Sequence, residues 1–216
     1  MSLWRQQAAH AALEWVGDHR VLGIGTGRTT QCFIDELVSI RSRIDACVAS
    51  SCATQAYLRA RGFTVLDLNV VESIPLYIDG ADEVNAVRQM IKGGGGAMTR
   101  EKIIASVAEC FVCIVDETKY VEHLGNFPIA LEVIPMARSF VAREVVKWGG
   151  NPIYRSGVLT DNGNCILDVH HLPIADPLAL EIQLNQLTGV VDNGLFAART
   201  ADRVCMAGPQ GGVRMF

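Results

Sequence analysis

The sequence contains no apolar run long enough to cross a membrane. A spanning helix needs about 20 consecutive apolar residues, whereas the longest runs, such as 110–115, have the length of a buried strand. Positive charge is not in excess, because 19 Lys+Arg stand against 23 Asp+Glu for a net charge of −4. A nucleic-acid binder would show a basic face or stripe. Since 50% of the residues are hydrophobic, disorder is excluded as well. We therefore expect one domain or two small ones, with neither a membrane nor a nucleic acid as partner.

The cysteines form no disulfide framework. There are seven, an odd number, and their scattered spacing fits reduced thiols of a cytosolic protein. Cys110 and Cys113 spell C-x-x-C, but they lie in a predicted strand, where residues three apart point to opposite faces. We expect core cysteines there, and no second set of Cys or His completes a zinc site. Polar residues interrupt any secretory signal near the N-terminus, so a cytoplasmic location is expected by elimination.

Short apolar runs alternate with helical patterns in the first half of the chain. Strands are expected at 21–24, 46–50, 63–68, 75–78 and 110–115, and helices at 2–16, 30–40, 53–61 and 99–108. This alternation predicts an α/β domain, a Rossmann-like, mainly parallel sheet flanked by helices.

A second pattern begins after Leu124. Strands are expected at 127–134 and 190–197, helices at 137–147 and 177–187, a break at 149–152, and a hairpin around Asp161-Asn162-Gly163-Asn164. The order β-α-β-β-α-β predicts a smaller α+β, ferredoxin-like domain. Strands at 203–207 and 212–216 should return to the first sheet. The expected domains are 1–124 with 200–216, which carries the catalysis, and 125–199.

A glycine-rich loop follows the first predicted strand. In Gly23-Ile24-Gly25-Thr26-Gly27-Arg28-Thr29-Thr30 the loop opens a helix, whose N-terminal N–H groups favour an anion. Arg28 stands where a dinucleotide fingerprint requires glycine, and the P-loop pattern fails too. The loop is either a phosphate cup without nucleotide specificity, with hydroxyl donors from Thr26 and Thr29, or a tight turn with a threonine cap.

Acidic residues follow another predicted strand, in Asp79-Gly80-Ala81-Asp82-Glu83. The carboxyl ends of parallel strands are where α/β sheets bind ligands. Three neighbouring acids repel one another, so they either hold sugar hydroxyls, act as acids and bases, bind Mg²⁺ or form a solvated turn.

Four consecutive glycines form a further candidate segment, Lys92-Gly93-Gly94-Gly95-Gly96. Such a run is costly in backbone entropy and suits close approach of the backbone to a ligand, although a flexible loop is the alternative. Lys92 could neutralise an oxyanion beside it. Glu101 starts the following helix, where the helix dipole favours its charged form, so a catalytic role requires partial desolvation. Lys119, after the strand at 110–115, could add a cation to the phosphate cup.

Taken together, these segments resemble ribose-5-phosphate isomerases of the A type. Similarity extends over essentially the whole chain, in order, through segments 23–30, 79–83, 92–102, 116–119 with 124–125, 132–135 and 160–164. The resemblance implies interconversion of D-ribose 5-phosphate and D-ribulose 5-phosphate in the non-oxidative pentose phosphate pathway. It also implies no metal, no organic cofactor, and a homodimer or dimer of dimers.

The resemblance further implies residue roles. The general base falls on Glu101, the sugar-contacting aspartates on Asp79 and Asp82, and the lysine on Lys92. The wider substrate site comprises Thr26, Gly27, Arg28, Thr29, Gly80, Ala81, Gly93, Gly94, Gly95 and Lys119. An enediolate mechanism fits these residue types, because one carboxylate can move the proton between C1 and C2 while Lys92 and loop N–H groups stabilise the oxyanion. Which of Asp79 and Asp82 opens the sugar ring stays open.

Two positions depart from the family pattern. Arg28 replaces a common serine, and its guanidinium either strengthens phosphate binding or points to solvent. Arg5 stands where relatives usually carry lysine. Rival interpretations are a sugar-phosphate-sensing regulator, an amino-sugar-phosphate deaminase or a CoA transferase on the same architecture. A catalytically silent sugar-phosphate binder and a nucleotide-binding Rossmann protein are the others.

Overall fold

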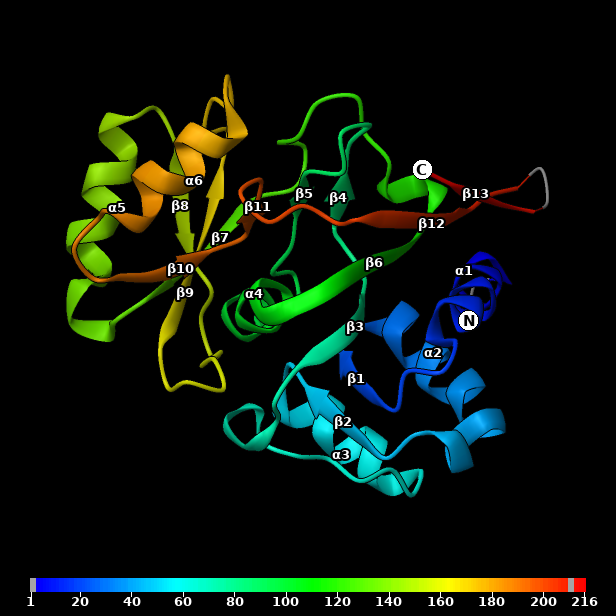
Figure 1. Cartoon of the computed structure of the whole chain (residues 1–216). Helices are drawn as coiled ribbons and strands as arrows, with labels where there is room; N and C mark the ends of the chain where they lie inside the picture. The colour runs from blue at the N-terminus through cyan, green and yellow to red at the C-terminus, as the bar shows by residue number, and fades with distance from the viewer. Residues whose placement is uncertain (1–2, 210–211) are drawn as a thin grey trace. The chain divides into compact units, whose positions relative to one another are not determined.

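A computed structural model describes residues 3–209 and 212–216, which form two compact units (Figure 1). The first comprises Met1–Ala81, Arg100–Tyr120 and Ala201–Phe216, and the second comprises Asp82–Thr99 and Val121–Thr200. Both are discontinuous in sequence, because each contains segments from distant parts of the chain.

The first unit contains a six-stranded sheet in the order β13-β12-β6-β3-β1-β2. Its strands are β1 (Val21–Ile24), β2 (Ala46–Ala49), β3 (Ile74–Asp79), β6 (Ala108–Asp116), β12 (Arg203–Ala207) and β13 (Val213–Met215). All neighbours pair in parallel except the edge pair β12 and β13. The prediction of a mainly parallel sheet that the C-terminal strands rejoin is confirmed.

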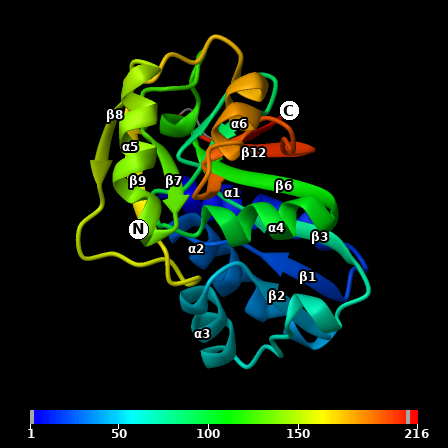
Figure 2. The same cartoon turned by 90° about the vertical axis from the view of Figure 1, so that its left-hand side faces the viewer.

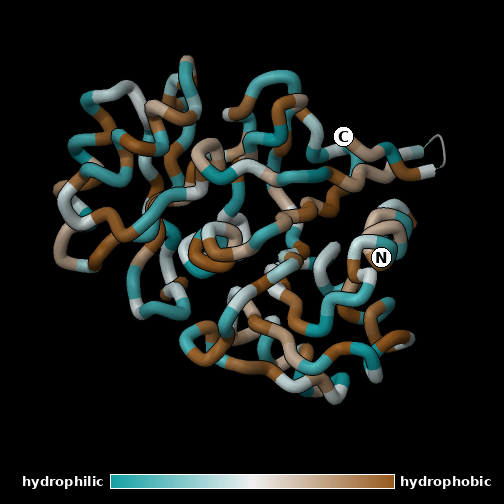
Figure 3. Tube along the Cα trace, viewed as in Figure 1, coloured by the Kyte–Doolittle hydropathy of each residue, from teal (hydrophilic) through white to brown (hydrophobic). Residues whose placement is uncertain are grey.

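Helices cover both faces of this sheet. The helices are α1 (Leu3–Val16), α2 (Arg28–Leu37), α3 (Cys52–Ala60) and α4 (Met98–Val107), with 3-10 turns η1 (Val38–Arg43), η2 (Leu68–Val70) and η3 (Glu117–Lys119). One core joins α1 and α2 to β1, β3 and β6 through buried side chains such as Ala12, Ile34 and Ile78. Helix α4 lies in front of β3 and β6 in Figure 2, on the other face. Hydrophobic and hydrophilic segments accordingly alternate along the trace (Figure 3).

The second unit contains a four-stranded antiparallel sheet in the order β10-β7-β9-β8. It consists of β7 (Ile129–Val133), 3-10 turn η4 (Pro135–Ala137), α5 (Arg138–Lys147), β8 (Asn151–Tyr154), β9 (Cys165–His170), α6 (Pro177–Asn185) and β10 (Val190–Asn193). Counted within this unit, the strand order is fourth, first, third, second. Val141 and Val145 of α5 and Leu184 of α6 share one core with β7 and β9. This is the predicted split βαβ arrangement.

A small three-stranded sheet, β11-β5-β4, also belongs to the second unit. It joins β4 (Glu83–Val84) and β5 (Met90–Ile91) to the distant β11 (Leu195–Phe196). The sequence placed 82–99 in the first domain, but this non-local pairing groups the segment with the second. The prediction of a single strand at 190–197 is wrong. The segment divides at Gly194 into β10 and β11, which belong to two different sheets. A Cβ at Gly194 would lie 2.2 Å from the Lys92 carbonyl oxygen.

Three local predictions also differ from the structure. Segment 63–68 forms only a bridge between Val65 and Cys47 before the chain enters η2. The predicted break at 149–152 overlaps β8, an edge strand, where Pro152 is tolerated because one side needs no N–H donor. The hairpin exists, but β8 pairs with β9 through Tyr154 and Leu167, so its loop is longer than an Asn-Gly turn.

No disulfide joins any of the seven cysteines, all of which lie in the part of the chain that the structure describes, in line with the predicted absence of a disulfide framework. Burial raises the pKa of the Cys47 thiol to about 12 and that of Cys205 to about 11. Cys113 is buried and Cys110 is half-buried on β6, as expected for packing residues. In the part of the chain that the structure describes, no helix is long and apolar enough to cross a membrane.

Candidate functional site

Asp79 ends β3 at the carboxyl edge of the first sheet, and its side chain is completely buried. Its Oδ1 accepts hydrogen bonds from the N–H groups of Gly80 (2.7 Å) and Thr26 (3.0 Å) and from the Thr30 hydroxyl (3.4 Å). Its Oδ2 accepts a 2.5 Å bond from the Tyr77 hydroxyl. Donors on both oxygens hold this carboxylate in one orientation beside the glycine-rich loop.

The glycines of Gly23-Ile24-Gly25 make room for side chains of β3. A Cβ at Gly25 would lie 1.8 Å from Asp79 Cγ, and one at Gly23 would lie 2.9 Å from Tyr77 Cδ2. The register explains the match, because β1 and β3 are parallel neighbours with Gly23 beside Tyr77. From the sequence, these glycines are interpreted either as part of a phosphate cup or as a tight turn with a threonine cap. Gly23 and Gly25 are two residues apart, as are Tyr77 and Asp79, so each glycine leaves space for one of these side chains.

The Thr26 hydroxyl belongs to a hydroxyl cluster. Thr26 Oγ1 lies 2.8 Å from Ser50 Oγ, 2.8 Å from Ser51 Oγ and 3.1 Å from Thr54 Oγ1. Thr54 in turn donates to the carbonyl oxygen of Gly25 at 2.8 Å, and Ser51 caps α3. The N–H of Thr26 also donates a hydrogen bond to Asp79. Together these contacts fix the conformation of the glycine-rich loop. Phosphate binding by the Thr26 side chain stays a prediction.

Helix α2 begins beside this cluster at Gly27, whose φ of +134° suits glycine. No side chain among residues 3–209 and 212–216 caps it. The first-turn N–H groups, including those of Arg28 and Thr29, are therefore available to an anion. The Arg28 side chain is exposed. The predicted phosphate cup is thus geometrically suitable, although its ligand stays a prediction.

Glu101 is buried in the first turn of α4. It lies close enough to Tyr77 for its charge to act on the phenol. Burial first, then the charges of Asp79 and Glu101, raise the pKa of the Tyr77 phenol well above its ordinary value. The phenol is therefore a neutral hydrogen-bond donor at physiological pH. The first unit thus brings Asp79 and Glu101 together around Tyr77, a residue that the sequence analysis missed. Its one signal was a position two residues before Asp79, on the same strand face.

Lys119 lies in η3, just after β6. Asp116, the last residue of β6, accepts hydrogen bonds from the N–H and the hydroxyl of Thr118. It also forms an ion pair with Arg5, whose Nε lies 3.3 Å from Asp116 Oδ2. Arg5 therefore places a guanidinium at the strand end from which Lys119 follows. The sequence left the consequence of arginine at this position open.

The second unit holds Asp82, Lys92 and the glycine loop. Asp82 Oδ2 accepts a 2.8 Å bond from the Gly94 N–H. Lys92 is buried, with its ammonium nitrogen 5.6 Å from the Phe196 ring centre and its backbone N–H bonded to Gly194. Of the four predicted catalytic residues, Asp79 and Glu101 therefore belong to the first unit, and Asp82 and Lys92 belong to the second.

Arg155 restrains the glycine loop, which argues against a merely flexible segment. Its Nη1 donates to the carbonyl oxygens of Gly93 (3.0 Å) and Gly94 (3.3 Å). The same guanidinium makes a paired contact with the Asp168 carboxylate, with Nε at 2.8 Å from Oδ2. The sequence analysis missed Arg155, because it lies about 60 residues from the loop and in no recognised motif.

Glu132 anchors the hairpin loop of the second unit. The fully buried carboxylate accepts bonds from the hydroxyls of Thr99 and Thr160 and the side-chain amides of Asn162 and Asn164. Segments 132–135 and 160–164, which carry part of the family resemblance, are thus structurally linked. Glu83 plays a similar part, since it accepts bonds from the N–H groups of Gly125 and Phe127.

Glu132→Gln should destabilise the protein by about 1–3 kcal/mol. The new side-chain NH2 group would face hydrogen-bond donors at a position where a carboxylate oxygen now accepts from them. Urea unfolding would measure the loss. Glu144→Gln is the matched control, since the side chain of Glu144 makes a surface ion pair with Lys147 and, within residues 3–209 and 212–216, no other hydrogen bond or ion pair. Its effect should stay within about 0.5 kcal/mol. Equal stability of the two variants would contradict the anchoring role.

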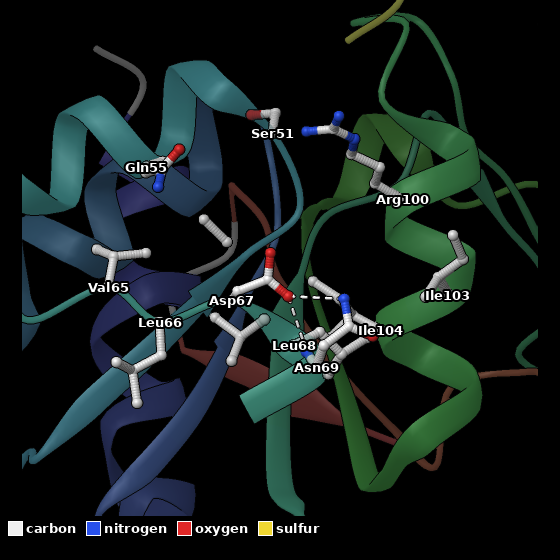
Figure 4. Close-up of a pocket in the computed structure, with 12 residues that line it drawn as sticks. Ser51, Gln55, Val65, Leu66, Asp67, Leu68, Asn69, Arg100, Ile103 and Ile104 are labelled. Carbon is white, nitrogen blue, oxygen red and sulfur yellow. Dashed lines mark hydrogen bonds between the residues drawn. The ribbon is translucent and has the colours of Figure 1, made fainter. Parts of the chain in front are cut away.

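A cavity of about 420 Å³ lies in the first unit, between β2, η2 and α4 (Figure 4). Val48, Val65 and Ile104 contribute apolar lining, while Arg100 extends toward Ser51 at one end. There Asp67 Oδ1 accepts hydrogen bonds from the backbone N–H and the side-chain amide of Asn69. The cavity adjoins the hydroxyl cluster through Ser51 but contains none of the predicted catalytic residues. Within the described residues, no group of three or more His, Cys, Asp or Glu side chains is arranged to hold a metal ion.

Comparisons with known proteins agree over nearly the whole chain. Residues 46–211 match the family described as ribose 5-phosphate isomerase A (phosphoriboisomerase A). The chain is 59% identical to ribose-5-phosphate isomerase A of Legionella pneumophila strain Lens, over 98% of both chains. The solved structure of ribose 5-phosphate isomerase A from Neisseria gonorrhoeae is 43% identical, with a TM-score of 0.95, and the match covers 99% of this chain and 95% of that one.

A third match is a D-ribose-5-phosphate isomerase solved in complex with phospho-erythronic acid. It is 36% identical, with a TM-score of 0.93, and the match covers 99% of this chain and 97% of that one. Together with the α/β fold and its buried carboxylates, these similarities define the protein as an isomerase. The chain belongs to the ribose 5-phosphate isomerase A family. The predicted family, fold class and enzyme class are confirmed.

Proposed function

We propose that the protein interconverts D-ribose 5-phosphate and D-ribulose 5-phosphate in the non-oxidative pentose phosphate pathway, with Glu101 as the general base. The observation that carries the proposal is the buried pair of carboxylates, Asp79 and Glu101, beside a neutral phenol in a chain of this family. Isomerisation of an aldose to a ketose moves one proton between C1 and C2 through an enediolate. A single carboxylate can remove that proton and return it to the neighbouring carbon.

The enediolate step develops negative charge on the sugar oxygens. The Lys92 ammonium and the N–H groups of Gly93 and Gly95 are suited to stabilise it, because they are held before the reaction begins. The N–H of Gly94 donates a hydrogen bond to Asp82, so it orients that carboxylate instead. No metal or organic cofactor is required for a proton transfer of this kind.

Opening of the furanose ring needs a group that exchanges a proton with the sugar hydroxyls. Asp79 has donors on both of its oxygens and is fully buried, which suits a fixed acceptor that orients the sugar. Asp82 is half-buried, with one bond from Gly94. We therefore assign ring opening to Asp82 and sugar positioning to Asp79. Gly80 and Ala81, between them, would place backbone groups against the sugar.

The phosphate would bind at the start of α2, through the N–H groups of Gly27, Arg28 and Thr29, with the loop held by Thr26. Lys119 would add a cation. Anchoring the phosphate aligns C1 and C2 with the base, since binding energy far from the reacting atoms is used for orientation.

Arg28→Ser should raise KM for ribose 5-phosphate about threefold to tenfold and leave kcat nearly unchanged, because a guanidinium near a phosphate contributes mainly electrostatic attraction. Steady-state kinetics at low and high salt would show a smaller salt dependence of KM in the variant. Arg59→Ser, on the exposed side of α3, is the control and should leave both constants unchanged. An unaltered KM for Arg28→Ser would place the side chain in solvent.

The deciding experiment is formation of ribulose 5-phosphate from ribose 5-phosphate by the purified protein in EDTA. Turnover supports the reaction and its independence of metal. A parallel thermal-shift assay with ribose 5-phosphate, NAD and CoA separates the alternatives, because a ligand at 100 times its Kd adds about 2.7 kcal/mol of stability. Stabilisation by ribose 5-phosphate without turnover would identify a silent binder. Stabilisation by CoA or NAD instead would overturn the assignment.

We further propose that the protein acts in the cytoplasm as a homodimer or dimer of dimers. The support is its family membership and the reduced thiols. Light scattering after size-exclusion chromatography would test the assembly, and a monomer at micromolar concentration would contradict it.

A further inference from the structure

Tyr77 is a fully buried tyrosine in β3 of the first sheet. Its ring packs against Phe111 with centroids 4.9 Å apart. Its hydroxyl lies 2.5 Å from Asp79 Oδ2. Packing alone would be satisfied by phenylalanine, so the hydroxyl needs a separate explanation.

The surroundings of Tyr77 favour this hydroxyl. Gly23, on the neighbouring strand, leaves space where a Cβ would lie 2.9 Å from the ring. Burial and the charges of Asp79 and Glu101 raise the pKa of the phenol, so at physiological pH it is neutral and can donate a hydrogen bond to a carboxylate. Ser50, from the hydroxyl cluster around Thr26, also interacts with the phenol. The same phenol therefore touches the carboxylate that we assign to the sugar and lies within the field of the proposed base.

We propose that Tyr77 is a positioning residue of the isomerase, which holds Asp79 in its sugar-binding orientation and links it to the glycine-rich loop. The inference rests on the proposed function. It adds a residue that acts through Asp79 and does not itself touch the substrate. Without the phenol, Asp79 Oδ2 loses the 2.5 Å hydrogen bond from Tyr77, and the carboxylate is held less firmly in the orientation that the donors of Thr26 and Gly80 also favour.

The test is Tyr77→Phe in the full chain, which removes one oxygen and keeps the ring packing. We expect kcat/KM for ribose 5-phosphate to fall about tenfold to a hundredfold, in the range for a misplaced catalytic group. Loss of a donor to the ionised carboxylate should also move the acid limb of the pH profile of kcat/KM to higher pH. Tyr57→Phe is the matched control, because it removes a phenol that donates to Asp35 at the surface. It should leave the rate and the profile unchanged.

A double-mutant cycle with Asp79→Asn distinguishes positioning from general destabilisation. If Tyr77 acts through Asp79, Tyr77→Phe should have almost no further effect on the rate in the Asp79→Asn background. Independent effects in the two backgrounds would overturn the proposal. So would a Tyr77→Phe enzyme with the rate and pH profile of the wild type.

Two further controls keep the result interpretable. Thermal unfolding would confirm that Tyr77→Phe is folded. If it were not, 3-fluorotyrosine at position 77 would keep the hydroxyl and make it a stronger hydrogen-bond donor to Asp79. The acid limb should then move to lower pH, opposite to the shift expected for Tyr77→Phe. An unshifted limb with fluorotyrosine would overturn the proposal. Wild-type protein without isomerase turnover would overturn the proposed function and this inference together, whereas an active wild type beside an equally active Tyr77→Phe would overturn only the inference.

Discussion

Glu101→Gln should reduce kcat for ribose 5-phosphate by about 10⁴-fold or more, at the upper end of the range for a lost general base. The amide has nearly the shape of the carboxylate but cannot accept the proton from the sugar carbon. Since Glu101 is buried in the first turn of α4, the substitution removes a charge while the helix and its packing are retained. KM should change little, because the lost interaction acts in the proton-transfer step.

The measurement is steady-state turnover in EDTA, together with exchange of the substrate C2 proton with solvent. Glu109→Gln is the control, since Glu109 is an exposed residue of β6 in the same unit, and it should retain full activity. Activity of Glu101→Gln within threefold of the wild type would remove Glu101 from the role of base. The search would then turn to Asp79 and Asp82.

Gly25→Ala should lower kcat/KM by about a hundredfold or more, because the new methyl group would have to displace the Asp79 carboxylate by more than an ångström. An ideal Cβ at this position lies 1.8 Å from Asp79 Cγ and 2.4 Å from Asp79 Cβ. The clash should also cost about 1–3 kcal/mol of stability, as overpacking does elsewhere.

The control for this prediction is Gly150→Ala in the second unit. There a Cβ would lie 2.9 Å from side-chain atoms of both Val145 and Val169, so a steric clash, smaller than that at Gly25, is expected far from Asp79 in sequence and outside its unit. Urea unfolding of both variants and kinetics on the folded fractions would separate the effects. We expect Gly150→Ala to lose stability but keep its kcat. Similar kcat values for the two variants would show that Asp79 tolerates displacement.

The candidate site was predicted from sequence only as a set of residues. Linked segments identified Glu101, Asp79, Asp82 and Lys92, because family resemblance depends on the order and identity of residues. Tyr77 and Arg155 were not found, since each acts on another segment through a contact that no local pattern encodes. Thr26 was expected to offer its hydroxyl to a phosphate. In the structure Ser50, Ser51 and Thr54 lie within hydrogen-bond distance of that hydroxyl, and its binding of a phosphate stays a prediction.

The sequence by itself determined the class of each unit, because strand and helix periods are local and the alternation of short apolar runs with amphipathic segments admits few architectures. It also determined the family and the reaction. Only the tertiary structure decided that β5, within 82–99, pairs with β11 and that 190–197 divides at Gly194. It alone decided that two loop glycines make space for Tyr77 and Asp79. These features depend on strands that are neighbours in space but lie 50 or more residues apart, where hydrogen-bond register and steric fit decide which side chains meet.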